Sequence, residues 1–184
     1  MRIIAGSLGG RRIRVVAGDR IRPTASRVRE ALFSILGPDL TGARVLDAYA
    51  GSGALGFEAL SRGAADATFV EPAPAAVRRL EENVRALGVE AVVTVIRGRV
   101  LEHLARASHP YGLILADPPY ELQEEPAFLR AAAIRLSREG ILVLERDIHG
   151  APLAVPAGLR HTRTARYGSN CLEFYAPVPG DDLG

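Results

Sequence analysis

The stretch DAYAGSGALG, residues 47–56, decides the fold, because it follows a short β-prone run and opens a helical pattern. Its glycines have the spacing G-x-G-x-x-G (Gly51, Gly53, Gly56), and Glu71 ends the next β-prone run 20 residues after Gly51. Glycines let the backbone approach a ligand closely, and an acid at that distance can accept hydrogen bonds from both hydroxyls of a ribose. The stretch therefore predicts a nucleotide-type ligand at the end of the first strand, and taken alone it also fits a dinucleotide.

Strand and helix patterns alternate around this stretch. We expect strands at residues 44–48, 67–71, 92–96, 112–117 and 141–145, and helices at 55–62, 73–87, 100–107 and 124–137. Such alternation predicts a parallel sheet with helices on both faces. Residues 159–167 and 171–175 flank Gly168-Ser169-Asn170, which is typical of a hairpin. The expected fold is α/β and Rossmann-like, with a mostly parallel sheet closed by an antiparallel C-terminal edge hairpin and a frayed tail over 177–184.

We expect residues 1–22 to form a basic β-hairpin arm and residues 23–184 to form one domain. The arm contains two β-prone runs, 1–6 and 11–16, on either side of a glycine-rich turn. A helical pattern over 24–36 then begins the domain.

Charge is distributed unevenly between the two parts. Residues 1–29 hold eight arginines against Asp19, a net charge of +7, whereas residues 30–184 hold 15 arginines against 20 acids, a net charge of −5. A basic arm on a mildly acidic body predicts attraction to a phosphate-rich partner. A solvated hairpin whose charges only keep the chain soluble is the alternative. The candidate RNA-binding residues are Arg2, Arg11, Arg12, Arg14, Arg22 and Arg27.

Several classes of protein are disfavoured by the composition. The chain has no apolar stretch near the length of a membrane span and no signal-peptide pattern, so we expect a cytoplasmic protein without membrane contact. The single cysteine, Cys171, excludes an intrachain disulfide, and its alternating surroundings predict a core position. The four histidines lack ligand spacing, so we expect no metal site.

A second motif, Asp117-Pro118-Pro119-Tyr120, ends the apolar run 112–116. The prolines stop the strand and make the turn rigid. The carboxylate of Asp117 and the carbonyl of Pro118 can accept the two N–H bonds of an exocyclic amine, while the ring of Tyr120 can stack on a base. The motif predicts catalytic roles for Asp117, Pro118 and Tyr120.

Asp47 distinguishes between the possible cofactors. It stands four residues before Gly51, where its charge would repel a pyrophosphate but would suit a ligand that carries an ammonium and a sulfonium. A hydride-transfer site also has no use for the motif that begins at Asp117. Together the two motifs predict S-adenosylmethionine as cofactor, bound through Asp47, Gly51, Gly53 and Glu71.

These motifs resemble those of the class I methyltransferases that act on exocyclic amines. The amino end narrows the resemblance, because segments 2–6, 9–11, 22–24 and 27–33 are similar to the bacterial RsmD-type enzymes, which methylate a guanine N2 in small-subunit ribosomal RNA. The similarity runs from residue 1 to about residue 175. One departure concerns the adenine. Many class I methyltransferases carry an acid where this chain has Arg99, so we expect the backbone of Arg99 or Val100 to meet the adenine.

The resemblance implies an enzyme that transfers a methyl group from S-adenosylmethionine to the exocyclic N2 of a guanine in 16S rRNA. It further implies that ribosomal proteins present the RNA in an assembled or assembling small subunit. An enzyme acting on adenine N6 in DNA or RNA, or on a protein glutamine, is one alternative, because the motif at Asp117 serves any planar amine. A non-catalytic RNA-binding assembly factor is another, and intact Asp47, Glu71, Asp117 and Tyr120 argue against it.

Overall fold

The computed structural model describes residues 1–15, 23–119 and 124–179. Seven strands form one sheet in the order β3-β2-β1-β4-β5-β7-β6. Strands β3, β2, β1, β4 and β5 pair in parallel, and β7 pairs antiparallel with both β5 and β6. The elements are α1 (Pro23–Leu36), β1 (Arg44–Ala48), α2 (Ala54–Ser61), β2 (Asp66–Glu71), α3 (Pro74–Leu87), η1 (Glu90–Val92), β3 (Val93–Arg97), α4 (Val100–Arg106), β4 (Tyr111–Ala116), α5 (Glu125–Arg135), β5 (Leu136–Asp147), β6 (Leu159–Tyr167) and β7 (Asn170–Pro177).

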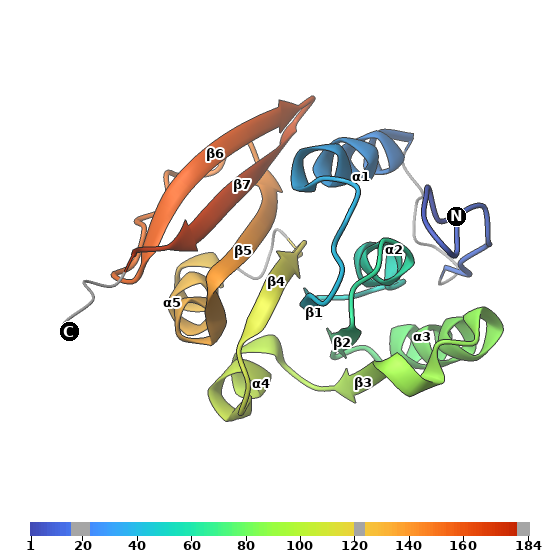
Figure 1. The fold of residues 1–184 in the computed structure, drawn as a ribbon. Helices are drawn as coiled ribbons and strands as arrows, with labels where there is room; N and C mark the ends of the chain where they lie inside the picture. Colours follow the sequence, from blue (N-terminus) through green and yellow to red (C-terminus); the bar gives the residue numbers. More distant parts are fainter. Residues whose placement is uncertain (16–22, 120–123, 180–184) are drawn as a thin grey trace.

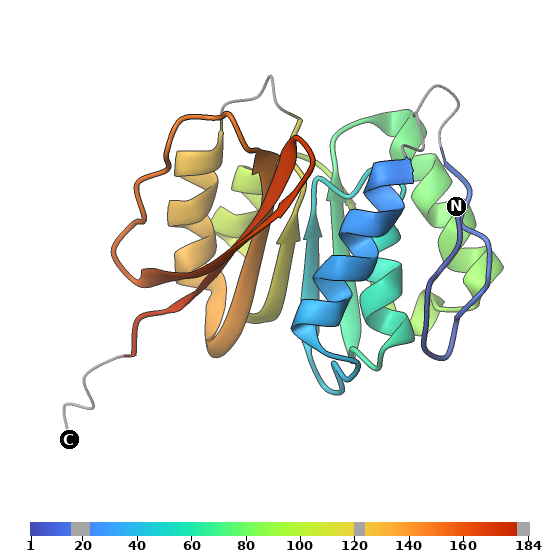
Figure 2. The same ribbon diagram turned by 90° about the horizontal axis from the view of Figure 1, so that it is seen from above.

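Helices cover both faces of the sheet, as the alternation predicted (Figures 1 and 2). Helices α1, α2 and α3 pack on one face around buried residues such as Phe33, Phe57 and Phe69. Helices α4 and α5 pack on the other face around residues such as Phe128 and Ile114. The expected Rossmann-like, mostly parallel sheet with an antiparallel C-terminal edge hairpin is confirmed, and Cys171 is buried as expected.

The amino-terminal residues 1–15 pair antiparallel through the bridge between Arg2 and Arg12, which is shorter than the expected strands. The pairing turns Ile3 and Ile13 into the core, where each is 2% exposed. The buried carboxylate of Glu58 on α2 accepts hydrogen bonds from the backbone N–H groups of Ile4 and Ala5 at 2.7 and 3.2 Å. The first 15 residues are therefore packed onto the domain, beside α2 and α3 (Figure 2).

Two boundaries differ from the expectation. Helix α5 ends at Arg135, and β5 begins directly at Leu136 and runs 12 residues, although the sequence suggested a short strand over 141–145. Leu136 pairs with Tyr111 before the register with β4 shifts, so pairing with the neighbouring strand overrides the local helical pattern. The chain end also differs, because β7 includes Pro177 and the N–H of Val178 bonds to the carbonyl of Gly158.

No helix within the described ranges combines the length and the apolar character that a bilayer crossing requires.

Candidate functional site

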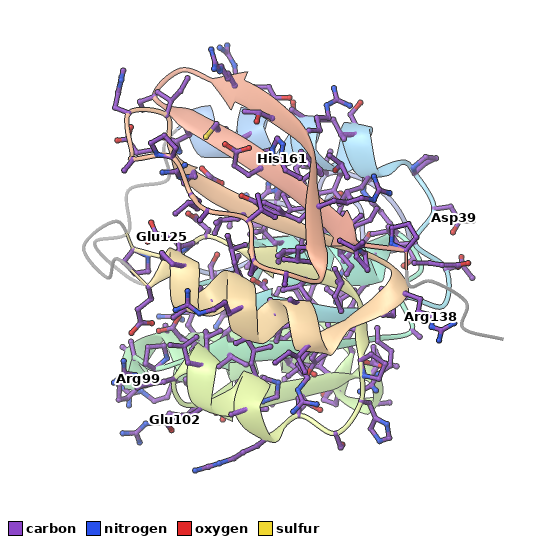
Figure 3. The ribbon with its side chains drawn as sticks, turned by 90° about the vertical axis from the view of Figure 1, so that its left-hand side faces the viewer. Asp39, Arg99, Glu102, Glu125, Arg138 and His161 are labelled. Atoms are coloured by element: carbon purple, nitrogen blue, oxygen red, sulfur yellow. The ribbon has the colours of Figure 1, made fainter. Side chains whose placement is uncertain are left out.

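The predicted cofactor residues meet at the carboxyl edge of the sheet, which we define as the C-terminal ends of β1, β2 and β4. The chain runs outward from β1 through β2 to β3 and then crosses back to β4 on the other side of β1, so the strand order reverses here and a crevice opens at this point. The register sets Ala48 beside Ala116, so Asp117 follows directly beyond the edge. Figure 3 shows Arg99 and Glu125 at this end of the molecule and Asp39 and Arg138 at the other.

Two cavities open at this edge and share part of their walls. The outer groove, of about 640 Å³, is lined by Glu71, Ala73, Arg99, Val100 and Pro119, among others. The inner cavity, of about 270 Å³, extends beneath residues 1–15 and α1. Tyr49, Gly51 and Asp117 line both. Asp47, Gly51, Glu71, Arg99 and Val100 each line one or both cavities together with Asp117, whereas Gly53 is not among the lining residues.

The glycines of the first motif serve different physical purposes. Gly51 has φ +52°, and a Cβ there would point into open space, so its backbone is bare toward the shared wall of the two cavities. Gly56 instead allows α2 to approach the sheet, because a Cβ would come within 2.4 Å of the Phe69 ring. Both features keep the turn after β1 tight and exposed to a ligand.

Glu71 joins the glycine turn to the start of α3. Its two carboxylate oxygens accept hydrogen bonds from the N–H of Gly51 at 2.9 Å and the N–H of Ala73 at 2.8 Å. A carboxylate has about four acceptor positions, so two remain for the hydroxyls of a ribose in the outer groove. The arrangement fits the predicted ribose contact, because the carboxylate is already held in place.

Asp47 is buried in β1, and its Oδ2 accepts a hydrogen bond from the N–H of Gly56 at 2.8 Å. Burial raises the pKa of Asp47 to about 8; the hydrogen bond from Gly56 opposes this rise, and the nearby charges of Asp117 and Glu71 add to it. A carboxyl with this pKa is mostly protonated at neutral pH in the ligand-free protein, and a bound cation favours its charged form. The Asp47 side chain therefore fits a cationic ligand better than a pyrophosphate.

The second predicted motif follows β4 directly. Asp117 is exposed at the wall of both cavities, and Pro118 is buried behind it. Tyr120, the predicted stacking residue, lies outside the described residues, as does Arg22 of the predicted RNA-binding set. The described part of the motif places the Asp117 carboxylate at the wall of both cavities and Pro119 at the wall of the outer groove.

Arg99 caps the amino end of α4, and Val100 is the first residue of that helix. The Arg99 guanidinium donates to Glu124 at 2.7 Å, a residue that the sequence analysis did not select. Glu124 also accepts a hydrogen bond from the Tyr49 hydroxyl at 3.5 Å. The residue pair places a carboxylate at the wall of the outer groove, although position 99 itself is basic.

Tyr49 is a second residue that the sequence analysis missed. Its backbone φ is +60°, a conformation that residues other than glycine rarely adopt. Its ring packs edge-on against Phe128 at a centroid distance of 5.9 Å. Strained backbone conformations of this kind are found most often at active sites and ligand-binding turns. Its position inside the quoted motif, directly after Ala48, was the available signal.

The predicted RNA-binding arginines divide into two groups. Arg11 donates to the carbonyls of Leu87, at 2.7 Å, and of Ala86 at the end of α3. Arg2 donates to the carbonyl of Gly10 at 2.6 Å. All five described arginines are exposed, but no side-chain hydrogen bond to a backbone carbonyl is found for Arg12, Arg14 or Arg27 within the described residues, and Arg14 makes a long ion pair of 3.7 Å with Glu82. The RNA-binding role of these arginines stays a prediction, and Arg2 and Arg11 also bind backbone carbonyls.

Comparisons with known proteins identify the family. The profile of the family described as "Conserved hypothetical protein 95" matches residues 1–176. "Ribosomal RNA small subunit methyltransferase D" of Escherichia coli (strain K12) is 37% identical over 177 residues, which cover 95% of this chain and 89% of that protein. The solved structure "Putative methyltransferase yhhF from Escherichia coli" has a TM-score of 0.85 and 32% identity, covering 96% of this chain and 97% of that one.

A more distant structure shares the fold. The T. thermophilus "16S rRNA N2 G1207 methyltransferase (RsmC) in complex with AdoMet and Guanosine" has a TM-score of 0.72 at 24% identity, and the match covers 93% of this chain and 46% of that one. The chain belongs to the family described as Conserved hypothetical protein 95, which is the RsmD family of small-subunit ribosomal RNA methyltransferases.

Proposed function

We propose that the protein transfers a methyl group from S-adenosylmethionine to the exocyclic N2 of a guanine in 16S rRNA. The observation that carries this proposal is the position of Asp117, which lies on the wall of both the outer groove and the inner cavity. A carboxylate there can hold an amine beside a bound methyl donor. The E. coli relative, by its name, acts on ribosomal RNA of the small subunit.

The proposed cofactor-binding residues bind S-adenosylmethionine and fix its orientation. Glu71 accepts the ribose hydroxyls while the N–H groups of Gly51 and Ala73 fix its carboxylate. Asp47 meets the ammonium group, and the backbone at Arg99 and Val100 borders the adenine end of the groove. The bound cofactor supplies an electrophilic methyl group on a sulfonium. The carboxylates of Asp47, Glu71 and Asp117 suit this positive charge, because all three line the walls of the two cavities.

The target amine needs orientation more than activation. The lone pair of guanine N2 is delocalised into the ring, so the nitrogen is a weak nucleophile and the rate depends on positioning and electrostatics. The carboxylate of Asp117 and the carbonyl of Pro118 accept the two N2 protons and direct the remaining electron density toward the methyl group. Tyr120 stacks on the base. A paired guanine must leave its stack to reach this crevice.

The RNA is presented by an assembled or assembling small subunit, with ribosomal proteins as contacts, and the enzyme works in the cytoplasm. The exposed arginines, among them Arg12, Arg14 and Arg27, face the RNA phosphates. Phosphate contacts of this kind position the substrate, and base contacts at the crevice specify it.

A methyl-transfer assay tests the proposal. Radiolabelled S-adenosylmethionine is supplied with unmethylated small subunits, with naked 16S rRNA or with DNA, and the labelled nucleoside is identified after digestion. We expect N2-methylguanosine, formed faster on subunits than on naked RNA. Asp117→Ala, which removes the acceptor at the reacting amine, is the inactive control.

Other products would replace the proposal with a specific alternative. Labelled N6-methyladenosine would assign the site to adenine, and labelled protein would assign it to a glutamine. Cofactor binding without transfer to any of the substrates would favour the assembly-factor alternative.

A further inference from the structure

Arg29 on α1 is a buried cation that the proposed mechanism does not use. It is 5% exposed, and burial lowers the pKa of its guanidinium. One terminal nitrogen donates to the carbonyl of Arg2 at 2.9 Å, and the other contacts the sulfur of Met1. Its Nε has no hydrogen-bond partner, and the ion pairs of the described residues do not include Arg29. A buried guanidinium with an unpaired donor costs free energy unless a ligand satisfies it.

The surroundings of Arg29 indicate which ligand that is. Arg29 lines the inner cavity together with Asp47, Gly51, Asp117 and Glu145. Three carboxyls in the lining disfavour an anion alone, and burial raises the pKa of both Asp47 and Glu145. A guanidinium in the same lining makes the cavity complementary to a zwitterion, whose ammonium binds the acids and whose carboxylate binds the cation.

We infer that Arg29 binds the carboxylate of the amino-acid end of S-adenosylmethionine, while Asp47 binds its ammonium. The inference rests on the cofactor and not on the RNA substrate, so a binding experiment without RNA separates it from the proposed function. A planar guanidinium can bind a carboxylate through two parallel hydrogen bonds, which Nε and a terminal nitrogen can supply.

An RNA phosphate is a poorer candidate for the same cation. Phosphates of a folded ribosomal RNA stay at the protein surface, whereas Arg29 is 5% exposed beneath the first residues of the chain. The inner cavity holds about 270 Å³ and shares its wall at Gly51 with the cofactor groove. The free end of a bound cofactor can enter it from that side without displacing the arm.

Three ligands test the inference by calorimetry on the whole protein. S-adenosylmethionine carries both the ammonium and the carboxylate, decarboxylated S-adenosylmethionine keeps only the ammonium, and 5′-methylthioadenosine carries neither. We expect Arg29→Met to weaken S-adenosylmethionine binding about twentyfold, the scale of a lost charged hydrogen-bond pair. Binding of the other two ligands is expected to stay within twofold of the wild type.

Two further variants control for structure. Arg29→Lys keeps the charge but loses the planar contact, so its affinity for S-adenosylmethionine is expected to fall about fivefold while its affinity for the other two ligands is unchanged. This variant replaces Arg29→Met in the test if Arg29→Met does not fold. Ser61→Ala removes another anchor of the amino-terminal residues, since the Ser61 hydroxyl accepts the N–H of Leu8 at 2.9 Å. It is expected to bind all three ligands like the wild type.

Three results would overturn the inference. Equal losses for all three ligands in the Arg29 variants would make Arg29 a purely structural anchor. Unchanged S-adenosylmethionine affinity would remove Arg29 from the cofactor site, and a fall in RNA affinity in that case would reassign it to a phosphate. Loss of S-adenosylmethionine binding in Ser61→Ala to the same extent would show that the arm, not the cation, controls the cavity.

Discussion

The carboxyl edge of the sheet and the amino-terminal arm both carry predicted functional residues. Strand pairing sets the positions of the residues at the edge, but it does not set those of the arginines on the arm. Asp47, Glu71 and Asp117 come from strands whose register is set by backbone pairing, and the nearby charges of Glu71 and Asp117 contribute to the raised pKa of Asp47. The arginines of the arm were predicted from charge alone. Arg11 turned out to be occupied by carbonyls at the end of α3. Backbone pairing therefore determines where the residues at strand ends lie, whereas a local excess of charge does not determine which arginines also bind carbonyls.

The largest expected effect lies at the edge. Asp117→Ala is expected to reduce methyl transfer about a thousandfold, because an acceptor at the reacting nitrogen is worth several kcal/mol of barrier. Cofactor affinity is expected to stay near that of the wild type. The variant loses the attraction of Asp117 for the sulfonium, but Asp47 then ionises more easily, and the two effects oppose each other. Single-turnover kinetics alongside calorimetry measures both quantities. Near-normal turnover would end the mechanism proposed above.

Glu71 provides the second-largest test of the edge. Glu71→Ala is expected to weaken S-adenosylmethionine binding by about 2 kcal/mol, roughly thirtyfold, through lost charge-assisted bonds to the ribose. Because Glu71 also holds the N–H groups of Gly51 and Ala73, Glu71→Gln is the matched control that preserves the side-chain shape. Affinity unchanged in both variants would mean that the ribose is bound elsewhere.

The two regions also differ in what the sequence could predict. The strand–helix alternation, the terminal hairpin and the position of Glu71 at the end of the second strand follow from periodicity and residue spacing, which are local signals, whereas the strand order was not predicted. Glu124 and Arg29 could not be selected in this way, because their roles depend on long-range packing: Glu124 meets Arg99 from 25 positions away, and Arg29 is enclosed by the first residues of the chain. The β5 start at Leu136 was missed for the same reason, since a neighbouring strand extends it.

Asp47 gives the edge a pH dependence that the arm lacks. Its folded pKa of about 8 lies above the ordinary 3.8, so the folded, ligand-free protein retains a proton that the unfolded chain loses, and its free energy of unfolding is expected to fall as pH rises from about 4 to about 8. Because the cofactor ammonium favours the charged carboxylate, binding below pH 8 is expected to release a proton. Affinity then tightens by up to about tenfold per pH unit between pH 6 and 7.5.

Calorimetry in two buffers of different ionisation enthalpy measures that proton. Asp47→Asn, which keeps the acceptor for Gly56 but cannot ionise, is expected to bind S-adenosylmethionine more weakly and with no proton release. Proton release that persists in Asp47→Asn would assign the titration to another group.

The smallest expected effects are within the arm, where Arg11 and Arg12 form a matched pair of neighbours. Arg12 is exposed, so Arg12→Ala is expected to weaken RNA binding about fivefold and to reduce the slope of log K against log salt by somewhat under one, with no change in melting temperature. Arg11 is bound to the end of α3, so Arg11→Ala is expected to cost about 1 kcal/mol of stability and to leave the slope unchanged.

Filter binding at increasing salt and thermal unfolding distinguish the two variants. Arg160, Arg163 and Arg166 on the exposed part of β6 form a second possible RNA surface, which Arg163→Ala tests. If Arg12→Ala and Arg163→Ala both leave the salt slope unchanged, neither position contacts phosphate. If Arg163→Ala is the one variant that flattens the salt slope, RNA lies along β6 and the arm serves only to close the inner cavity. If Arg11 alone flattens it, its guanidinium leaves α3 when RNA binds, and the division between anchoring and binding arginines does not hold in the complex.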